Sequence, residues 1–244
     1  MSPAISVGRQ HPKGRKIILL LLAIGMIVAC VVAIKATYPI FGAGRARAAI
    51  EQAGGQVTIA WGAWLRPTGA VTAVKLQGSK VHDEDLLPLR DLSYVVSLQL
   101  TKSSVTDSGL APLANLKQLV KLDLSSNHIG DLGMQYVGGL PNLQFLTLVN
   151  TDVGSEGLKR LVGLKSLVAL DLSDTRVDDS GVASLKELPN LRFLSLAGTK
   201  VTDASIPQLG DLQQCKQIVL KHTGVSASGE RKLKELLPAC EIER

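Results

Sequence analysis

Aromatic side chains are scarce in this chain of 244 residues, which contains three phenylalanines, three tyrosines and two tryptophans. Cysteine is equally scarce, and three cysteines are too few to staple a small secreted fold together. The four histidines are scattered, and the sequence has no Cys-x-x-Cys pair, H-E-x-x-H segment, P-loop or G-x-G-x-x-G turn. We therefore expect no enzyme activity, no cofactor, no metal site and no catalytic residues.

Acidic residues are missing from the first 35 positions, which carry five bases, at Arg9, Lys13, Arg15, Lys16 and Lys35. Residues 36–244 then hold 22 of the 27 bases and all 21 acids, a net charge of +1. The basic character of the chain thus belongs to its N-terminal segment. Because nucleic acid requires a concentrated field of lysine and arginine, we do not expect it as a partner.

A long apolar run follows this basic start and predicts a membrane segment. The run begins at Ile17, ends at Ile34 and has 18 uncharged residues, just enough for a helix to cross a hydrocarbon core of roughly 30 Å. The positive-inside rule places the tail, residues 1–16, in the cytoplasm. We therefore predict a transmembrane signal anchor over residues 17–35, with the rest of the chain on the extracytoplasmic side. A cleaved signal peptide and a lipoprotein attached through Cys30 remain alternatives.

Leucine recurs every 24 residues, at Leu76, Leu100, Leu124, Leu148, Leu172, Leu196 and Leu220. A fixed period of roughly 20–29 residues is typical of a solenoid, in which each repeat buries its apolar side against its neighbours. Other apolar residues stand two and five positions before each of these anchor leucines, and five positions after it. Because strand side chains alternate, the L-x-L spacing predicts a strand with both leucines on its inner face.

A short helix is predicted in the second half of each repeat, from apolar pairs 13 and 16 positions after the anchor, such as Leu161 and Leu164, or Leu233 and Leu236. We expect the residue seven positions after each anchor to cap the N-terminus of its own helix: Asp83, Asp107, Asp131, Ser155, Asp179 and Asp203. We also expect polar residues three positions after the anchor to satisfy backbone groups: Ser79, Ser103, Asn127, Thr151, Thr175, Thr199 and Thr223.

The segments LDLSSNHIGDLG, LTLVNTDVGSEGLKRL, LDLSDTRVDDSGVASL and LSLAGTKVTDASIPQL resemble leucine-rich repeats, and the resemblance covers residues 71–242. Their T-x-V-T-D-x-G-L pattern is similar to that of repeats in bacterial membrane-anchored or exported proteins, and also to that of repeats in F-box substrate adaptors. The resemblance implies an α/β solenoid, curved, with a parallel concave sheet and short convex helices, that binds other macromolecules. We assign residues 71–244 to this domain, as seven 24-residue repeats and a partial C-terminal cap.

Both ends of the solenoid need covering. We assign residues 36–70 to a linker and N-terminal cap, in which the sequence predicts a helix over 45–53 and a strand over 56–60. Trp61 and Trp64 are expected to cover the core or, alternatively, to form an aromatic ligand site. At the C-terminus it predicts a helix over 231–237 and the start of a strand over 240–242. Cys215 and Cys240 fall on adjacent turns, either as a disulfide or as two buried thiols.

The strongest functional signal lies on the outward positions of the strands. Phe145 and Phe193 stand three residues before their anchors, two repeats apart, so they would flank Ala169 about 10 Å from each other. The predicted partner-binding residues are Lys121, Asp123, Phe145, Thr147, Asp171, Arg192 and Phe193, with the charged members as a rim. Aromatic anchors within a polar rim are typical of protein-binding surfaces.

We therefore expect a membrane-anchored protein that binds another protein or an envelope component through its concave face. The alternative is a structural spacer or self-associating cell-surface element without a dedicated ligand. A cytosolic substrate adaptor is disfavoured, because residues 1–16 are too short for an effector-recruiting module.

Overall fold

The computed structural model describes residues 43–59 and 70–244. The predicted tail, the anchor with its alternatives, Trp61 and Trp64 lie outside the described residues. In the part that is described, no helix combines the length and the apolar character needed to cross a membrane. The described residues belong to one compact unit, Gly42–Arg244.

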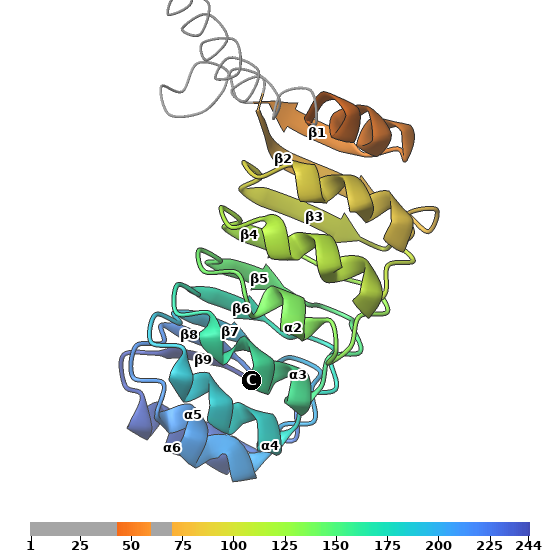
Figure 1. Ribbon diagram of the computed structural model, residues 1–244. Helices are drawn as coiled ribbons and strands as arrows, with labels where there is room; N and C mark the ends of the chain where they lie inside the picture. The colour runs from red at the N-terminus through yellow and green to blue at the C-terminus, as the bar shows by residue number, and fades with distance from the viewer. Residues whose placement is uncertain (1–42, 60–69) are drawn as a thin grey trace, which may run out of the picture. The chain divides into compact units, whose positions relative to one another are not determined.

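Nine strands form a single sheet in which the order in space follows the order in sequence (Figure 1). The strands are β1 (Gln56–Ile59), β2 (Val71–Gln77), β3 (Ser97–Thr101), β4 (Lys121–Asp123), β5 (Phe145–Thr147), β6 (Ala169–Asp171), β7 (Phe193–Ser195), β8 (Gln217–Val219) and β9 (Glu241–Glu243). Strand β1 is antiparallel to β2, and all later pairs are parallel. Residues 24 apart face each other, as Phe145 faces Ala169 and Ala169 faces Phe193. The predicted repeat unit is therefore confirmed.

Short helical segments cover one side of the sheet and leave the other side bare (Figure 1). They are η1 (Asp83–Asp91), η2 (Asp107–Asn115), α2 (Met134–Val137), α3 (Ser155–Arg160), η3 (Leu161–Gly163), α4 (Asp179–Val182), η4 (Ala183–Glu187), η5 (Asp203–Ser205), α5 (Ile206–Gly210) and α6 (Ala227–Leu236). Five of these segments are 3₁₀ helices. With three residues per turn, a 3₁₀ helix brings residues i and i+3 onto one line, which suits the apolar pairs of the sequence.

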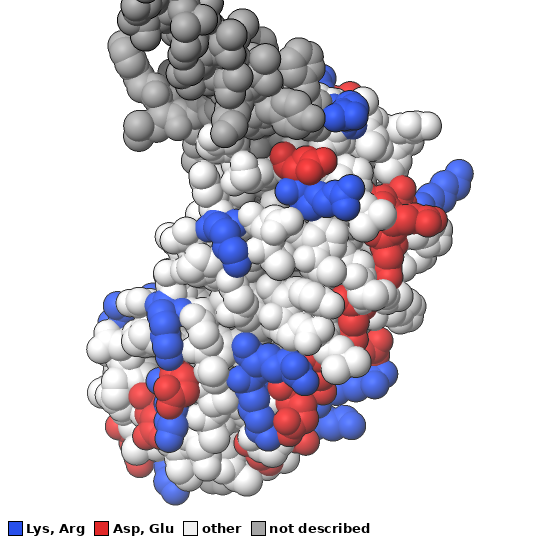
Figure 2. Space-filling model, viewed as in Figure 1, with Lys and Arg blue, Asp and Glu red and all other residues white. Residues whose placement is uncertain are grey.

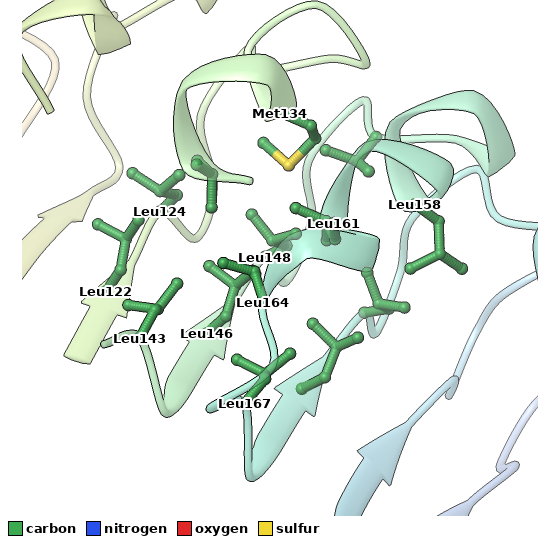
Figure 3. Packing of buried hydrophobic residues seen from close by; sticks show 14 of the residues in the cluster. Leu122, Leu124, Met134, Leu143, Leu146, Leu148, Leu158, Leu161, Leu164 and Leu167 are labelled. Atoms are coloured by element: carbon green, nitrogen blue, oxygen red, sulfur yellow. The ribbon is translucent and has the colours of Figure 1, made fainter. Parts of the chain in front are cut away.

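The core lies between the sheet and the helical segments. All seven anchor leucines have no exposed surface. Figure 3 shows Leu146 of β5 and Leu148, directly after it, pointing away from the bare side of the sheet, toward Leu161 and Leu164 of the helical side. Each repeat adds one such layer, so the apolar interior is continuous along the chain.

The prediction that Leu236 points inward is wrong. Its side chain is 40% exposed, whereas that of Leu237 is 3% exposed. The reason is the helix type, because α6 is a true α-helix of 10 residues. At about 100° per residue, position i+4 lies about 40° from Leu233 on one side, toward the core, and position i+3 lies about 60° from it on the other side, at the boundary with solvent.

Both ends of the described unit carry extra elements. A helix over residues 43–52 precedes β1, and its Ala46 and Ile50 are buried in the core. These elements fall where the sequence predicts a cap helix and strand. At the other end β9 adds to the sheet beside β8, with Ile218 facing Ile242.

The polar column three residues after each anchor behaves as predicted. Thr151, Thr175 and Thr199 are buried, and each hydroxyl donates to the carbonyl of its own anchor leucine. Asn127 instead bridges two repeats, since its Nδ2 donates to Leu100 O at 2.7 Å and to Leu124 O at 2.8 Å. These bonds satisfy carbonyls at the point where the chain leaves the strand.

The predicted N-caps have a different role, and that prediction is wrong. In η2, α4 and η5 the N-cap is the residue before the predicted one: Thr106, Asp178 and Thr202. The predicted residues instead accept hydrogen bonds from the next repeat. We call Asp83, Asp107, Asp131, Ser155, Asp179 and Asp203 the inter-repeat ladder, because each accepts the backbone N–H of the residue 23 positions later.

The inter-repeat ladder also explains a column of glycines two residues after it. A Cβ on Gly133 would lie 2.6 Å from Asp107 Oδ1, and one on Gly157 would lie 2.5 Å from Asp131 Oδ1. The preference for glycine is therefore set by the neighbouring repeat and not by its own turn. Where serine replaces it, the Ser205 hydroxyl donates to Asp179.

Candidate functional site

Six of the seven predicted site residues lie on adjacent strands of the bare side of the sheet, here called the sheet face. Strand β4 carries Lys121 and Asp123, β5 carries Phe145 and Thr147, β6 carries Asp171 and β7 carries Phe193. The parallel register aligns Asp123, Thr147 and Asp171 in one row across three strands. Alternation along each strand turns these side chains away from the leucine core.

A hollow of about 200 Å³ brings four of these residues together. It is lined by Lys121, Asp123, Phe145 and Thr147, with Ser97, Leu98, Gln99 and Leu122. The Lys121 ammonium lies 5.2 Å from the centre of the Phe145 ring, within the range of a cation–π contact. The ring of Phe145 therefore already attracts a cation on one side.

The two phenylalanines flank a small residue, as the sequence predicts. Phe145 and Phe193 both face Ala169, one from each neighbouring strand. Phe145 is 39% exposed, which places it among the few large apolar side chains that the described residues show to solvent. Phe193 is half-buried. The two phenylalanines thus stand on strands about 10 Å apart, with the small side chain of Ala169 on the strand between them.

The two aspartates of the sheet face have the same local geometry, because both begin the tripeptide Asp-Leu-Ser. Asp123 Oδ1 accepts the backbone N–H of Ser125 at 3.0 Å and its hydroxyl at 2.6 Å. Asp171 Oδ1 accepts the same two bonds from Ser173. Each carboxylate is thus fixed through one oxygen, and the other oxygen receives no hydrogen bond from a described residue.

Arg192 lies apart from this group. It stands just before β7, and its guanidinium donates to the backbone oxygen of Gln214 at 2.8 Å and to the side-chain oxygen at 2.7 Å. It lines a separate hollow of about 400 Å³ with Lys186, Asp211 and Gln213. Arg192 therefore contributes to the edge of the neighbouring repeat, and the structure does not place it beside the phenylalanines.

One feature of the described surface is not predicted from the sequence. A polar hollow of about 450 Å³ follows the turns after β4 to β7, with His128, Asp152 and Arg176 in its lining. Arg176 and His128 both contact the carboxylate of Asp152. The backbone is left-handed at the second position after several anchors, including Ser126, Asn150 and Asp174. The glycine at the equivalent positions 78 and 198 is the sequence signal for this column.

Charges on the helical side are mixed. Figure 2 shows lysine and arginine side chains interspersed with aspartate and glutamate, and no large area of one sign on the face that it displays. Ion pairs such as Lys159 with Glu156 and Lys234 with Glu230 account for part of this mixture. Surface pairs of this kind stabilise the fold little and do not define a site.

Metal-binding and thiol chemistry find little support in the described residues. No group of three or more His, Cys, Asp or Glu side chains there is arranged to hold a metal ion. Cys215 and Cys240 are free thiols in the structure. Burial raises the pKa of Cys215, and burial together with the neighbouring Cys215 raises the pKa of Cys240 to about 12. Neither thiol is therefore set up as a nucleophile.

Comparisons with known proteins agree with the repeat geometry. Residues 93–153 and residues 163–186 match two family models, both described as leucine-rich repeat. A solved structure of a leucine-rich repeat protein from Leptospira interrogans is similar with a TM-score of 0.47 and 19% identity, over 64% of this chain and 50% of that one. This chain thus spans about half the length of that protein. None of the curated protein sequences matches. The two family-model matches identify residues 93–153 and 163–186 as leucine-rich repeats, and the 24-residue register of the sheet supports a leucine-rich repeat solenoid.

Proposed function

We propose that the chain binds another protein, or another component of the cell envelope, through its sheet face. The observation that carries this proposal is the exposure of Phe145 beside a hollow that also holds Lys121, Asp123 and Thr147. An aromatic side chain loses a large apolar area to water when a partner covers it, and the polar neighbours supply specificity. Leucine-rich repeats in general mediate protein–protein contacts, so the role is one of binding without catalysis.

The second part of the proposal is a membrane tether. The uncharged run from Ile17 to Ile34 and the basic residues before it support a single-pass anchor with a cytoplasmic N-terminus. The repeats would then work on the extracytoplasmic side, where they meet envelope components or other exported proteins. Fractionation of cells that express the full chain, followed by protease protection of the repeats in spheroplasts, tests this topology.

A structural spacer or self-associating element is the competing function. Such an element needs no exposed aromatic residue on the sheet face, so Phe145 and Phe193 distinguish the two. Two other large apolar residues, Leu87 and Leu132, are 51% and 61% exposed on the helical side. They provide a matched control, because their removal deletes a similar apolar area from a different surface.

The test is affinity capture from detergent-solubilised native membranes with the full-length chain as bait. Three baits run in parallel: the wild type, Phe145→Ala/Phe193→Ala and Leu87→Ala/Leu132→Ala, each checked by circular dichroism for an unchanged fold. We expect a partner that the wild type and the leucine variant retain and the phenylalanine variant loses. A partner retained equally by all three baits, or no partner at all, would count against binding through the sheet face and favour the spacer.

A further inference from the structure

Among the described residues of β5, β6 and β7, Asp171 is the only one with a charged side chain. We define the central patch as the outward residues of β5 to β7 together with Ser173, which fixes Asp171 by hydrogen bonds. Its members are Phe145, Thr147, Ala169, Asp171, Ser173, Phe193 and Ser195. Thr147 and Ser195 are the register partners of Asp171 on either side, and both are uncharged. Asp171 itself is half-buried, and Ser195 is 5% exposed.

The carboxylate of Asp171 is held in one orientation. Its Oδ1 accepts from the Ser173 backbone at 3.0 Å and from the Ser173 hydroxyl, which in turn lies 2.8 Å from the Ser195 hydroxyl. Its Oδ2 accepts no hydrogen bond from a described residue, and no lysine, arginine or histidine of the described chain forms an ion pair with it. A half-buried carboxylate with no countercharge gains most from a cation that arrives on a partner.

Asp123 differs from Asp171 in its surroundings. It has the same serine-fixed geometry and forms no ion pair with a described residue, but the cationic Lys121 lines the same hollow. Lys121 also shows that the Phe145 ring accepts a cation above its face. No second cation of a described residue lies over the Phe145 ring, and on the side of Ala169 the next aromatic residue is Phe193.

We propose that the central patch receives a basic side chain, arginine or lysine, from the bound partner. The apolar stem lies over Ala169 between the two phenylalanine rings, and the cationic head reaches Oδ2 of Asp171. Ala169 and Asp171 are two residues apart on one strand and therefore about 7 Å apart. Long basic side chains are suited to this arrangement, because they bury an apolar stem while the charged end finds a polar partner. This inference rests on the proposed function and specifies the chemistry of the partner.

The test uses a short blocked glycine peptide with one arginine, and the same peptide with citrulline, which has nearly the same shape but no charge. The full-length chain in detergent micelles carries isotope-labelled phenylalanine, and its three phenylalanines give a simple NMR spectrum. We expect the arginine peptide to shift the ring signals of Phe145 and Phe193, and the citrulline peptide to bind at least about tenfold more weakly.

Two variants separate this inference from a general effect of charge. Asp171→Asn keeps the hydrogen bonds from Ser173 and should weaken binding of the arginine peptide roughly tenfold. The matched Asp123→Asn should change the affinity for that peptide less than about twofold. Ala169→Leu fills the gap, retains the charge and should abolish binding. Equal binding of both peptides, equal losses in the two asparagine variants, or no ring shift at the highest soluble peptide concentration would overturn the inference.

The outcome also separates the inference from the proposed function. Asp171→Asn serves as a fourth bait in the capture experiment. If it retains a partner that the phenylalanine variant loses, the sheet face binds a partner, but the inference of a basic side chain is wrong. If the arginine peptide binds as expected but no partner is captured, the side-chain preference holds and the proposed function fails.

Discussion

Asp179 of the inter-repeat ladder should contribute strongly to stability, although it lies near the surface. Its Oδ1 accepts the backbone N–H of Thr202 at 2.8 Å and also the Ser205 hydroxyl, and its Oδ2 accepts the Thr202 hydroxyl at 2.6 Å. Thr202 and Ser205 belong to the next repeat. Replacement by alanine therefore removes three hydrogen bonds that join two repeats.

The cost of Asp179→Ala follows from these three bonds. Each is worth about 1 kcal/mol net for a partly solvated carboxylate, so the total is about 3 kcal/mol. Part of this loss of stability arises because the Ser205 hydroxyl, on a residue with no exposed surface, would be left without its acceptor. A matched control is Asp91→Ala, because the exposed Asp91 carboxylate makes no hydrogen bond or ion pair with the described residues and should cost less than about 0.5 kcal/mol.

Urea unfolding of the full-length chain in mild detergent measures both variants, and amide hydrogen exchange locates the effect. A solenoid repeat contacts only its neighbours, so exchange should rise most in β7 to β9, beyond the weakened junction. Equal stability of the two alanine variants, or faster exchange confined to the first repeats, would refute the view that the ladder couples neighbouring repeats.

The same residue gives a pH dependence with a defined sign. Burial alone would raise the pKa of Asp179, but hydrogen bonds from Ser205 and Thr202 outweigh it and lower the pKa below its ordinary 3.8. The stabilisation is therefore complete above that ordinary value and is lost as the pH falls below it. The stability advantage of the wild type over Asp179→Asn should be constant near neutral pH and shrink below about pH 4. An advantage that grows on acidification would contradict the hydrogen-bond assignment.

Three further predictions follow from other residues. Gly157→Ala should lower the free energy of unfolding by about 2 kcal/mol, because the new Cβ would lie 2.5 Å from a carboxylate oxygen of the preceding repeat. Gly139→Ala, whose nearest contact would be at 3.9 Å, should change it by less than about 0.5 kcal/mol. The urea midpoints of the two variants check both values. Leu237→Ala should cost about 3 kcal/mol and Leu236→Ala less than about 1 kcal/mol, as thermal unfolding will measure. Because the pKa of Cys240 is raised to about 12, iodoacetamide at pH 8 should modify this thiol far more slowly in the folded chain than in urea. Peptide mass spectrometry measures the modification, and a disulfide would block the reaction in both states.

The repeat, the strand register and the buried columns could be predicted because they depend on local spacing. A leucine every 24 residues allows one sheet register, since a shift by one residue would turn Leu146 and Leu148 outward. The buried threonines after each strand are predictable for a similar reason. Their hydroxyls bond to carbonyls only three residues away.

Contacts between repeats could not be predicted in the same way. Asp107 and Asp179 stand where an N-cap is expected, and a sequence does not reveal that their acceptor oxygens reach a backbone N–H 23 residues later. The sequence predicts Arg192 in the charged rim of the phenylalanines, because it directly precedes Phe193. Its guanidinium instead pairs with Gln214 in the next repeat, which only the three-dimensional stacking brings near.

Variation among the repeats indicates which positions are free to serve binding. The anchor position is leucine in all seven repeats, and the ladder position is aspartate in five of the six residues that form it, because stacking imposes the same contacts each time. The outward strand position three residues before the anchor is instead alanine, serine, lysine, phenylalanine, alanine, phenylalanine and glutamine. No contact of the stacked core requires these side chains. A surface whose composition changes while its backbone repeats can present one distinct site at its centre, and here that centre combines two phenylalanines with the lone carboxylate of Asp171.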